Sequence, residues 1–233
     1  MTSLLTVKLG RDLRASWSRL LLMAIANAVS LMVFGGVLLV WGATARETRN
    51  AYLSTDPASA TILFDKPIDA EKLRAVAAEA RQRPGVIEAA GRTQFNSEVE
   101  VNGSRRFIPL QVFVAAPDDP MRVANFRIEP GSWPPAPGEL LIGRDSLGLL
   151  GVAVGDTVTV ETPSGDSVPL RVAGTVYDPS LSPSPQEQTG RGYLSTTSLA
   201  APGRPPSLDQ LKIQVFDGGR SQRNCSRARR CWG

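Results

Sequence analysis

Residues Leu20–Ala43 form an unbroken apolar run, LLLMAIANAVSLMVFGGVLLVWGA. It contains no charged residue, and Asn27 and Ser30 are its only clearly polar side chains. The run is longer than the roughly 20 residues with which a helix crosses the hydrocarbon core of a bilayer. Trp41 stands near its far end, where an indole ring favours the lipid–water interface. A core helix of a soluble protein would show a polar stripe, so we predict a transmembrane helix over residues 20–45.

The basic residues that flank this run predict its orientation. Four precede it with one acid and two follow it with one acid: Lys8, Arg11, Arg14 and Arg19 with Asp12, then Arg46 and Arg49 with Glu47. The positive-inside rule places the end with the excess of basic residues in the cytoplasm. We therefore expect a protein of the cell (plasma) membrane whose N-terminus is cytoplasmic and whose main domain is extracytoplasmic.

A cleaved signal peptide is the alternative interpretation of the same run. The sequence Ala43-Thr44-Ala45 matches the small-residue pattern that signal peptidase recognises. The apolar run, however, is well beyond the roughly 7–15 residues of a signal-peptide core. We favour an uncleaved anchor, and cleavage after Ala45 stays open.

Residues 1–19 have a helical pattern of their own. Leu5, Leu9, Leu13 and Trp17 recur at every fourth position, and the basic residues fall on the opposite side. This pattern predicts an amphipathic helix on the cytoplasmic membrane surface, with its basic face toward anionic head groups. A solvated basic flank that sets the topology explains the same residues, and the two interpretations are compatible.

Composition excludes several classes of function. The chain has no histidine, which removes histidine-based triads and histidine-ligated metal sites. Its two cysteines, Cys225 and Cys231, lie at the end, so the outer segment has no disulfide framework. Five of the 26 basic residues are arginines of residues 220–233, and without them 21 basic residues face 22 acidic ones. The outer segment is therefore not basic, and we predict no nucleic-acid partner.

The outer segment begins with a predicted β-α-β unit. Ala58–Asp65 is rich in β-formers, and Asp69 is placed to cap a helix that runs to about Gln82. Val86–Ala90 returns as a strand. The predicted buried stripe of the helix consists of Leu73, Val76, Ala77 and Ala80.

Two hairpins and several short strands follow. Asn102-Gly103 is a strong hairpin signal between alternating arms, and Pro163–Asp166 predicts a second hairpin turn. Asp118-Asp119-Pro120 is interpreted as a solvated turn rather than a carboxylate pair, and Pro179–Gln188 as a mobile loop. The other predicted elements are a helix over Asp145–Leu150 and strands at Leu140–Ile142, Thr157–Glu161, Val168–Val176, Gly192–Ser195 and Leu208–Phe216. Together they predict an α+β domain over residues 46–219.

No catalytic constellation is visible in this sequence. It has no phosphate-binding glycine loop with lysine and no cysteine metal cluster. Its acidic residues stand at turns and on faces expected to be wet. We therefore predict that the chain is not an enzyme, and we assign no catalytic, cofactor-binding or metal-binding residue and no cofactor.

The segment from Gly131 carries a resemblance to a known family. It reads GSWPPAPGELLIG, then LGLLGVAVGDTVTVETPSGDSVPLRVAGTVYD, and resembles the extracytoplasmic core of ABC transporter permeases of the MacB/FtsX type. In that family a proline-rich GE turn, a short helix, a GD-V-V strand and a V-G strand follow in this order. RPGVIEAAGR at 83–92 and RGYLSTTSLA at 191–200 look like two further segments of the same family. The resemblance covers roughly residues 1–218.

The resemblance implies a permease component that works with a cytoplasmic ABC ATPase subunit and a second permease subunit in the lipid bilayer. ATP-driven motion of the ATPase would reach the outer domain through the membrane spans, for export or for extracytoplasmic mechanotransmission. A single-pass, membrane-anchored binding or relay module without transport is the alternative.

One part of the sequence departs from the family pattern. Members carry three further spans after the outer domain, whereas here the sequence after Phe216 is not apolar and ends in SQRNCSRARRCWG. The abrupt change of composition over residues 220–233 suggests an out-of-frame tail on an interrupted permease. A genuine short form and an ordinary basic, disordered end are the alternatives.

Overall fold

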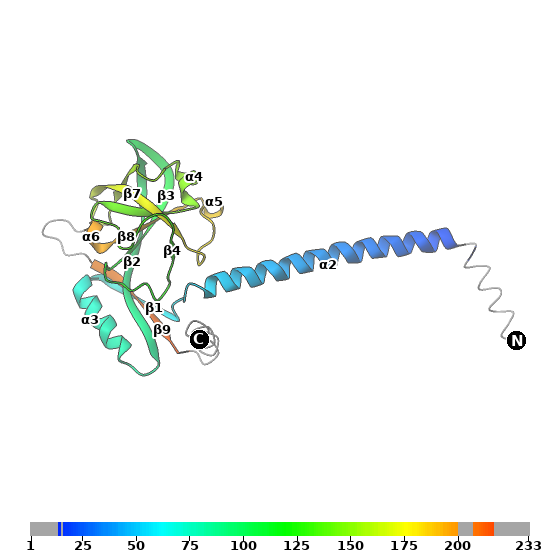
Figure 1. Ribbon diagram of the computed structural model, residues 1–233, viewed down its shortest axis with the longest axis horizontal. Helices are drawn as coiled ribbons and strands as arrows, with labels where there is room; N and C mark the ends of the chain where they lie inside the picture. The colour runs from blue at the N-terminus through cyan, green and yellow to red at the C-terminus, as the bar shows by residue number, and fades with distance from the viewer. Residues whose placement is uncertain (1–13, 15, 200–206, 217–233) are drawn as a thin grey trace, which may run out of the picture. The chain divides into compact units, whose positions relative to one another are not determined.

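The computed structural model describes residues 14, 16–199 and 207–216 (Figure 1). The chain divides into two compact units, residues 1–50 and 51–233. Most of the predicted amphipathic helix before Trp17, and all of the basic tail of residues 220–233, lie outside the described residues.

Helix α2, Trp17–Leu53, contains the apolar run. Its 37 residues include a window of mean hydropathy 2.2, and none of them is buried by the rest of the chain. By length and composition this helix can cross a membrane, properties that a signal sequence near an N-terminus shares. The helix continues past residue 45 to Leu53, and the side chain of Arg46 donates to the carbonyl of Gly42 at 2.9 Å.

The second unit, residues 51–233, holds the outer segment of the sequence and is called the outer unit below by its expected location. It is built on one sheet, which confirms the predicted α+β class. The sheet order is β1-β9-β2-β3-β8-β5-β7-β4, with β6 paired to β2 and β7. The strands are β1 (Ala60–Asp69), β2 (Val86–Val101), β3 (Ser104–Ala115), β4 (Arg127–Ile128), β5 (Glu139–Gly143), β6 (Thr157–Glu161), β7 (Ser167–Tyr177), β8 (Gly190–Ser195) and β9 (Ser207–Val215). The helices are α3 (Ala70–Arg81), α4 (Ser146–Leu150), α5 (Ser184–Glu187) and α6 (Thr196–Leu199).

The strand pairings close part of this sheet into a barrel. Starting from β2, each strand pairs with the next through β3, β8, β5, β7 and β6, and β6 returns to β2. Because side chains alternate along a strand, one set of residues fills the interior and the other faces out. On β3, Val112 and Val114 belong to the interior core, whereas Phe113 between them packs with an outer cluster. The main hydrophobic core is thus the inside of the barrel.

A second layer lies beside the barrel, where the first half of β2 continues beyond it. Strand β9 pairs antiparallel with both β1 and β2, so β1-α3-β2 is a β-α-β unit with β9 inserted between its strands. Helix α3 covers one face of this part of the sheet (Figure 1). Asp69 caps the helix as predicted, and its carboxylate accepts hydrogen bonds from the backbone N–H groups of Glu71 and Lys72.

Three sequence predictions need correction in detail. Val76 is 43% exposed rather than buried, because the inward stripe of α3 runs along Ala70, Leu73, Ala77 and the half-buried Ala80, and Val76 lies at its edge. The strand predicted at Val86–Ala90 and the first arm of the predicted Asn102-Gly103 hairpin are one strand, β2. The segment Pro179–Gln188 contains helix α5.

Helix α5 is packed rather than loose because it is tied to neighbouring elements by buried polar contacts. The hydroxyl groups of Ser146 and Ser184 lie 2.8 Å apart, and both residues are fully buried. The guanidinium of Arg191, on β8, pairs with the carboxylate of Glu187 at 2.7 Å. Buried polar groups are stable only when they find such partners, so these contacts hold α5 against α4 and β8.

Gly174 on β7 is a glycine around which the chain is packed very closely. Its neighbour Thr175 exchanges hydrogen bonds with Pro130 and Glu129, which brings the backbone of Pro130 directly over Gly174. A Cβ at Gly174 would lie 1.8 Å from the carbonyl oxygen of Pro130. Backbone cannot move aside cheaply, so only glycine fits here.

We therefore expect Gly174→Ala to lower the free energy of unfolding by about 3 kcal/mol or more, as overpacking against backbone does. Gly148→Ala is the matched control, since a Cβ at Gly148 meets nothing within 4 Å on the exposed side of α4. It should change stability by less than about 1 kcal/mol. Pulse proteolysis of the full chain across a urea series measures both. Equal midpoints for the two variants would contradict the close approach.

Candidate functional site

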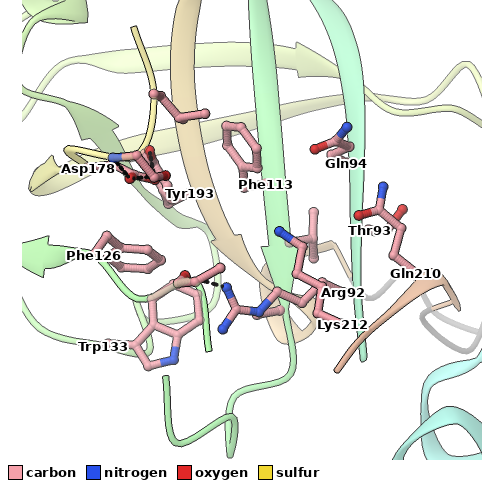
Figure 2. A pocket seen from close by; sticks show the side chains of 15 residues that line it. Arg92, Thr93, Gln94, Phe113, Phe126, Trp133, Asp178, Tyr193, Gln210 and Lys212 are labelled. Atoms are coloured by element: carbon pink, nitrogen blue, oxygen red, sulfur yellow. Dashed lines mark hydrogen bonds between the residues drawn. The ribbon is translucent and has the colours of Figure 1, made fainter. Parts of the chain in front are cut away.

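A hollow in the described part of the outer unit lies on the outside of the barrel (Figure 2). It encloses about 510 Å³ of space not filled by atoms, part of it open to solvent. Its floor is one face of the sheet, because the register places Phe113 beside Gln94 and Tyr193, and Arg92 beside Gln210.

A buried ion pair holds the covering segment over this floor. Arg92 Nε lies 3.0 Å from Asp119 Oδ2, with side chains only 9% and 3% exposed. The same guanidinium donates to the carbonyl oxygens of Ala124, at 2.9 Å, and Val123, at 2.7 Å. One side chain of β2 thus fixes both ends of the loop 119–124.

The behaviour of Asp119 corrects one sequence expectation. Asp118 and Asp119 do form a turn, and Asp119 N–H donates to the carbonyl of Ala116 at 3.0 Å. Asp119 is not solvated, however, because its carboxylate faces Arg92 and also accepts from Met121 N–H. Glu88 is a second buried acid, with Arg81 Nε at 2.7 Å. Local sequence could not reveal either buried acid. Arg92, the partner of Asp119, lies on β2 and is brought to the turn only by tertiary packing.

Aromatic rings form one wall of the hollow. Phe113 and Tyr193 stack with ring centroids 5.3 Å apart, and Phe126 lies 4.7 Å from Tyr193 and 5.5 Å from Trp133. The Tyr193 hydroxyl donates to Asp178 at 3.2 Å, and burial raises the pKa of Tyr193 well above its ordinary value. The Asp178 carboxylate also accepts from Ser180 N–H and Oγ.

The opposite wall is polar and comes from β9. Gln210 and Lys212 are two residues apart on this strand and therefore share a face. Gln210 is only 6% exposed. Neither side chain makes a hydrogen bond or ion pair to any residue that the structure describes. Burial, and then the nearby Arg92 charge, lower the pKa of Lys212.

A second hollow of about 350 Å³ lies between α3 and the turn at Asp118–Pro120. Its rim carries the exposed ion pair Arg74–Asp118, at 3.2 Å. Within residues 14, 16–199 and 207–216, no group of three or more cysteine, aspartate or glutamate side chains is placed to hold a metal ion. We take the first hollow as the candidate site because it has aromatic side chains on one side and cationic side chains on the other.

Two adjacent aspartates provide a test of the buried ion pair. Asp119→Ala leaves the Arg92 guanidinium buried without a countercharge, and we expect it to lower the free energy of unfolding by about 3–5 kcal/mol. Asp118→Ala removes an exposed pair and should cost at most about 1 kcal/mol. Urea unfolding of the full chain in detergent measures both variants. A difference between them of less than about 1 kcal/mol would show that the pair does not hold the loop.

No protein-family model matches the chain, and no curated protein matches it. Among solved structures, the chain is similar to the periplasmic region of MacB from Actinobacillus actinomycetemcomitans, with 10% identity and a TM-score of 0.46 over 70% of this chain and 78% of that one. It is also similar to the extracellular domain of the noncanonic ABC-type transporter YknZ from Gram-positive bacteria, with 11% identity and a TM-score of 0.46 over 70% and 86% of the two chains. A domain of a putative permease from Porphyromonas gingivalis has 14% identity and a TM-score of 0.40 over 60% and 61%. The chain is thus similar to the extracytoplasmic domains that its sequence motifs predicted.

Proposed function

We propose that this chain is a permease component of an ABC transporter, which couples a cytoplasmic ATPase to export or to extracytoplasmic mechanotransmission. The observation that carries the proposal is the order of elements along one chain. A helix long and apolar enough to cross a membrane precedes an α+β domain, and that domain contains the family's motifs in the family's order. The proposal includes an ATPase subunit and a second permease subunit as partners.

The structure of the motif-bearing segment supports this assignment. The stretch from Gly131 to Asp178 folds into the consecutive elements β5, α4, β6 and β7, and RGYLSTTSLA supplies β8 and α6. Strand β8 pairs with β5, which pairs with β7. The separate sequence signals therefore belong to one barrel, as expected if they are the parts of one inherited domain rather than unrelated turns.

A membrane-anchored binding or relay module without transport is the second candidate. The hollow on the barrel's outer face favours it, because a ligand site there needs no ATPase. The two candidates differ in whether a nucleotide-hydrolysing subunit is bound.

Orientation can be tested by cysteine labelling. We expect Ser164→Cys, in the exposed turn between β6 and β7, to react with a membrane-impermeant maleimide in intact spheroplasts. Ser3→Cys should react only after the membrane is opened, because basic flanks stay in the cytoplasm. Both variants are made with Cys225 and Cys231 changed to serine. Labelling of Ser3→Cys alone in intact spheroplasts would reverse the proposed topology.

The ATPase partner can be tested by purification. The tagged full chain, extracted in mild detergent from membranes of the organism that encodes it, should retain a subunit that hydrolyses ATP. The matched control replaces the span within α2 by an unrelated single-span helix, which keeps the anchor and removes the chain-specific contact surface. ATP hydrolysis that co-purifies with the native chain but not with the control supports the permease proposal. If neither preparation hydrolyses ATP above an untagged blank, the permease proposal is wrong and the binding-module candidate stands.

A further inference from the structure

We propose that the hollow on the outer face of the barrel binds a small amphipathic carboxylate, with its apolar body against the aromatic wall and its anionic group at Lys212. The inference concerns the outer domain alone and does not depend on coupling to an ATPase. It rests on one observation, namely that an aromatic wall and a polar wall with a lysine face each other across the same hollow.

The aromatic wall accounts for the apolar body of the ligand. Phe113, Phe126 and Trp133 are only partly buried, although they pack against the buried Tyr193. Their rings therefore retain accessible surface where the hollow opens. Apolar surface gains roughly 25 cal/mol per Å² when a ligand removes it from water, so an aryl or alkyl group is the natural occupant of this side.

The polar wall accounts for the negative charge that we propose for the ligand. Figure 2 shows Arg92 and Lys212 on the side of the space that faces Phe126 and Trp133. Arg92 is neutralised by Asp119. The ammonium of Lys212 forms no ion pair with a carboxylate among the described residues, and Asp178 and Asp119 attract its charge only from a longer distance. Burying a charge without a partner is unfavourable, and a ligand carboxylate would supply the missing partner.

Asp178 is the remaining charged residue that lines the hollow, and its contacts bear on the charge of the ligand. Asp178 stands on the side of Tyr193, and its carboxylate is already engaged by the Tyr193 hydroxyl and by Ser180. A cationic ligand would find aromatic faces but also the ammonium of Lys212 on the opposite wall. The buried amide of Gln210, which has no described partner, adds a hydrogen-bond donor beside Lys212. These groups favour an anion.

The experiment compares carboxylates with their neutral amides on the full chain in non-ionic detergent. Equilibrium dialysis, with a detergent-only blank, is made for phenylacetate, indole-3-acetate and octanoate and for the corresponding amides. We expect at least one acid to bind tenfold or more tightly than its amide. 2-Phenylethylamine, which has the same ring and the opposite charge, should bind no better than the blank. If no acid exceeds its amide, the proposal is overturned for the wild-type chain without any variant.

Two lysine variants then locate the charge. Lys212→Met keeps the length of the side chain and removes the ammonium, so the acid-over-amide preference should fall below twofold. Lys66→Met is the matched control, because Lys66 is exposed on β1 outside the hollow. It should keep the full preference. A preference that survives Lys212→Met would also overturn the proposal.

A variant of the aromatic wall and a measurement of stability complete the test. Phe126→Leu should weaken the acid and the amide by a similar factor, because it changes only the apolar wall. Lys212→Met should unfold at the same or a higher urea concentration than wild type, since it removes an unpaired, partly buried charge. If Lys212→Met instead unfolded much more easily, Lys212 would have an intramolecular partner, and the carboxylate site would be rejected.

Discussion

Strand β2 is the constraint on which the rest of the outer domain depends. Different strands pair with parts of its 16 residues: β9 with Val86–Arg92 and β6 with Val99–Val101 along one edge, and β3 with Arg92–Val101 along the other. The register shifts between Ser97 and Val99, where Ser97 Oγ accepts a hydrogen bond from Glu161 N–H at 2.8 Å. Residues Arg92–Val101 pair with β3 and belong to the barrel, whereas the strand before Arg92 belongs to the layer under α3. The two layers are therefore one sheet.

The same strand also places the chemistry of the candidate site. Because side chains alternate, β2 directs Val99 and Val101 into the barrel and Arg92 to the outer face. A guanidinium that is 9% exposed is stable only with its charge matched and its donors satisfied. The turn at Asp119 and the carbonyls of Val123 and Ala124 meet that need. The loop that carries these groups thereby becomes a wall of the hollow.

Local sequence signals predicted the parts of the fold that are local in origin. The Asn102-Gly103 turn is formed by two residues at positive φ, 49° and 80°, a conformation that this pair adopts readily. Asp69 caps α3, and the Pro163–Asp166 turn joins β6 to β7, with Gly165 at φ 86°. Each depends on residues a few positions apart. The exposure of Val76 and the packing of α5 depend on neighbours from elsewhere in the chain, and both were predicted wrongly for that reason.

The amino-acid sequence by itself determined the apolar membrane-length helix, the α+β class and most strand positions, because hydrophobic run length, alternation and turn residues act over short distances. The sequence alone assigned no residue to the candidate site. Arg92, Asp119, Tyr193 and Lys212 come from four separate segments and look like ordinary solvated or core residues when each is read in place. Only the tertiary structure decided that Asp119 neutralises Arg92 and that Lys212 is left without a partner opposite an aromatic wall. The physical reason is that charge pairing and desolvation depend on distance in space, which closure of the barrel sets.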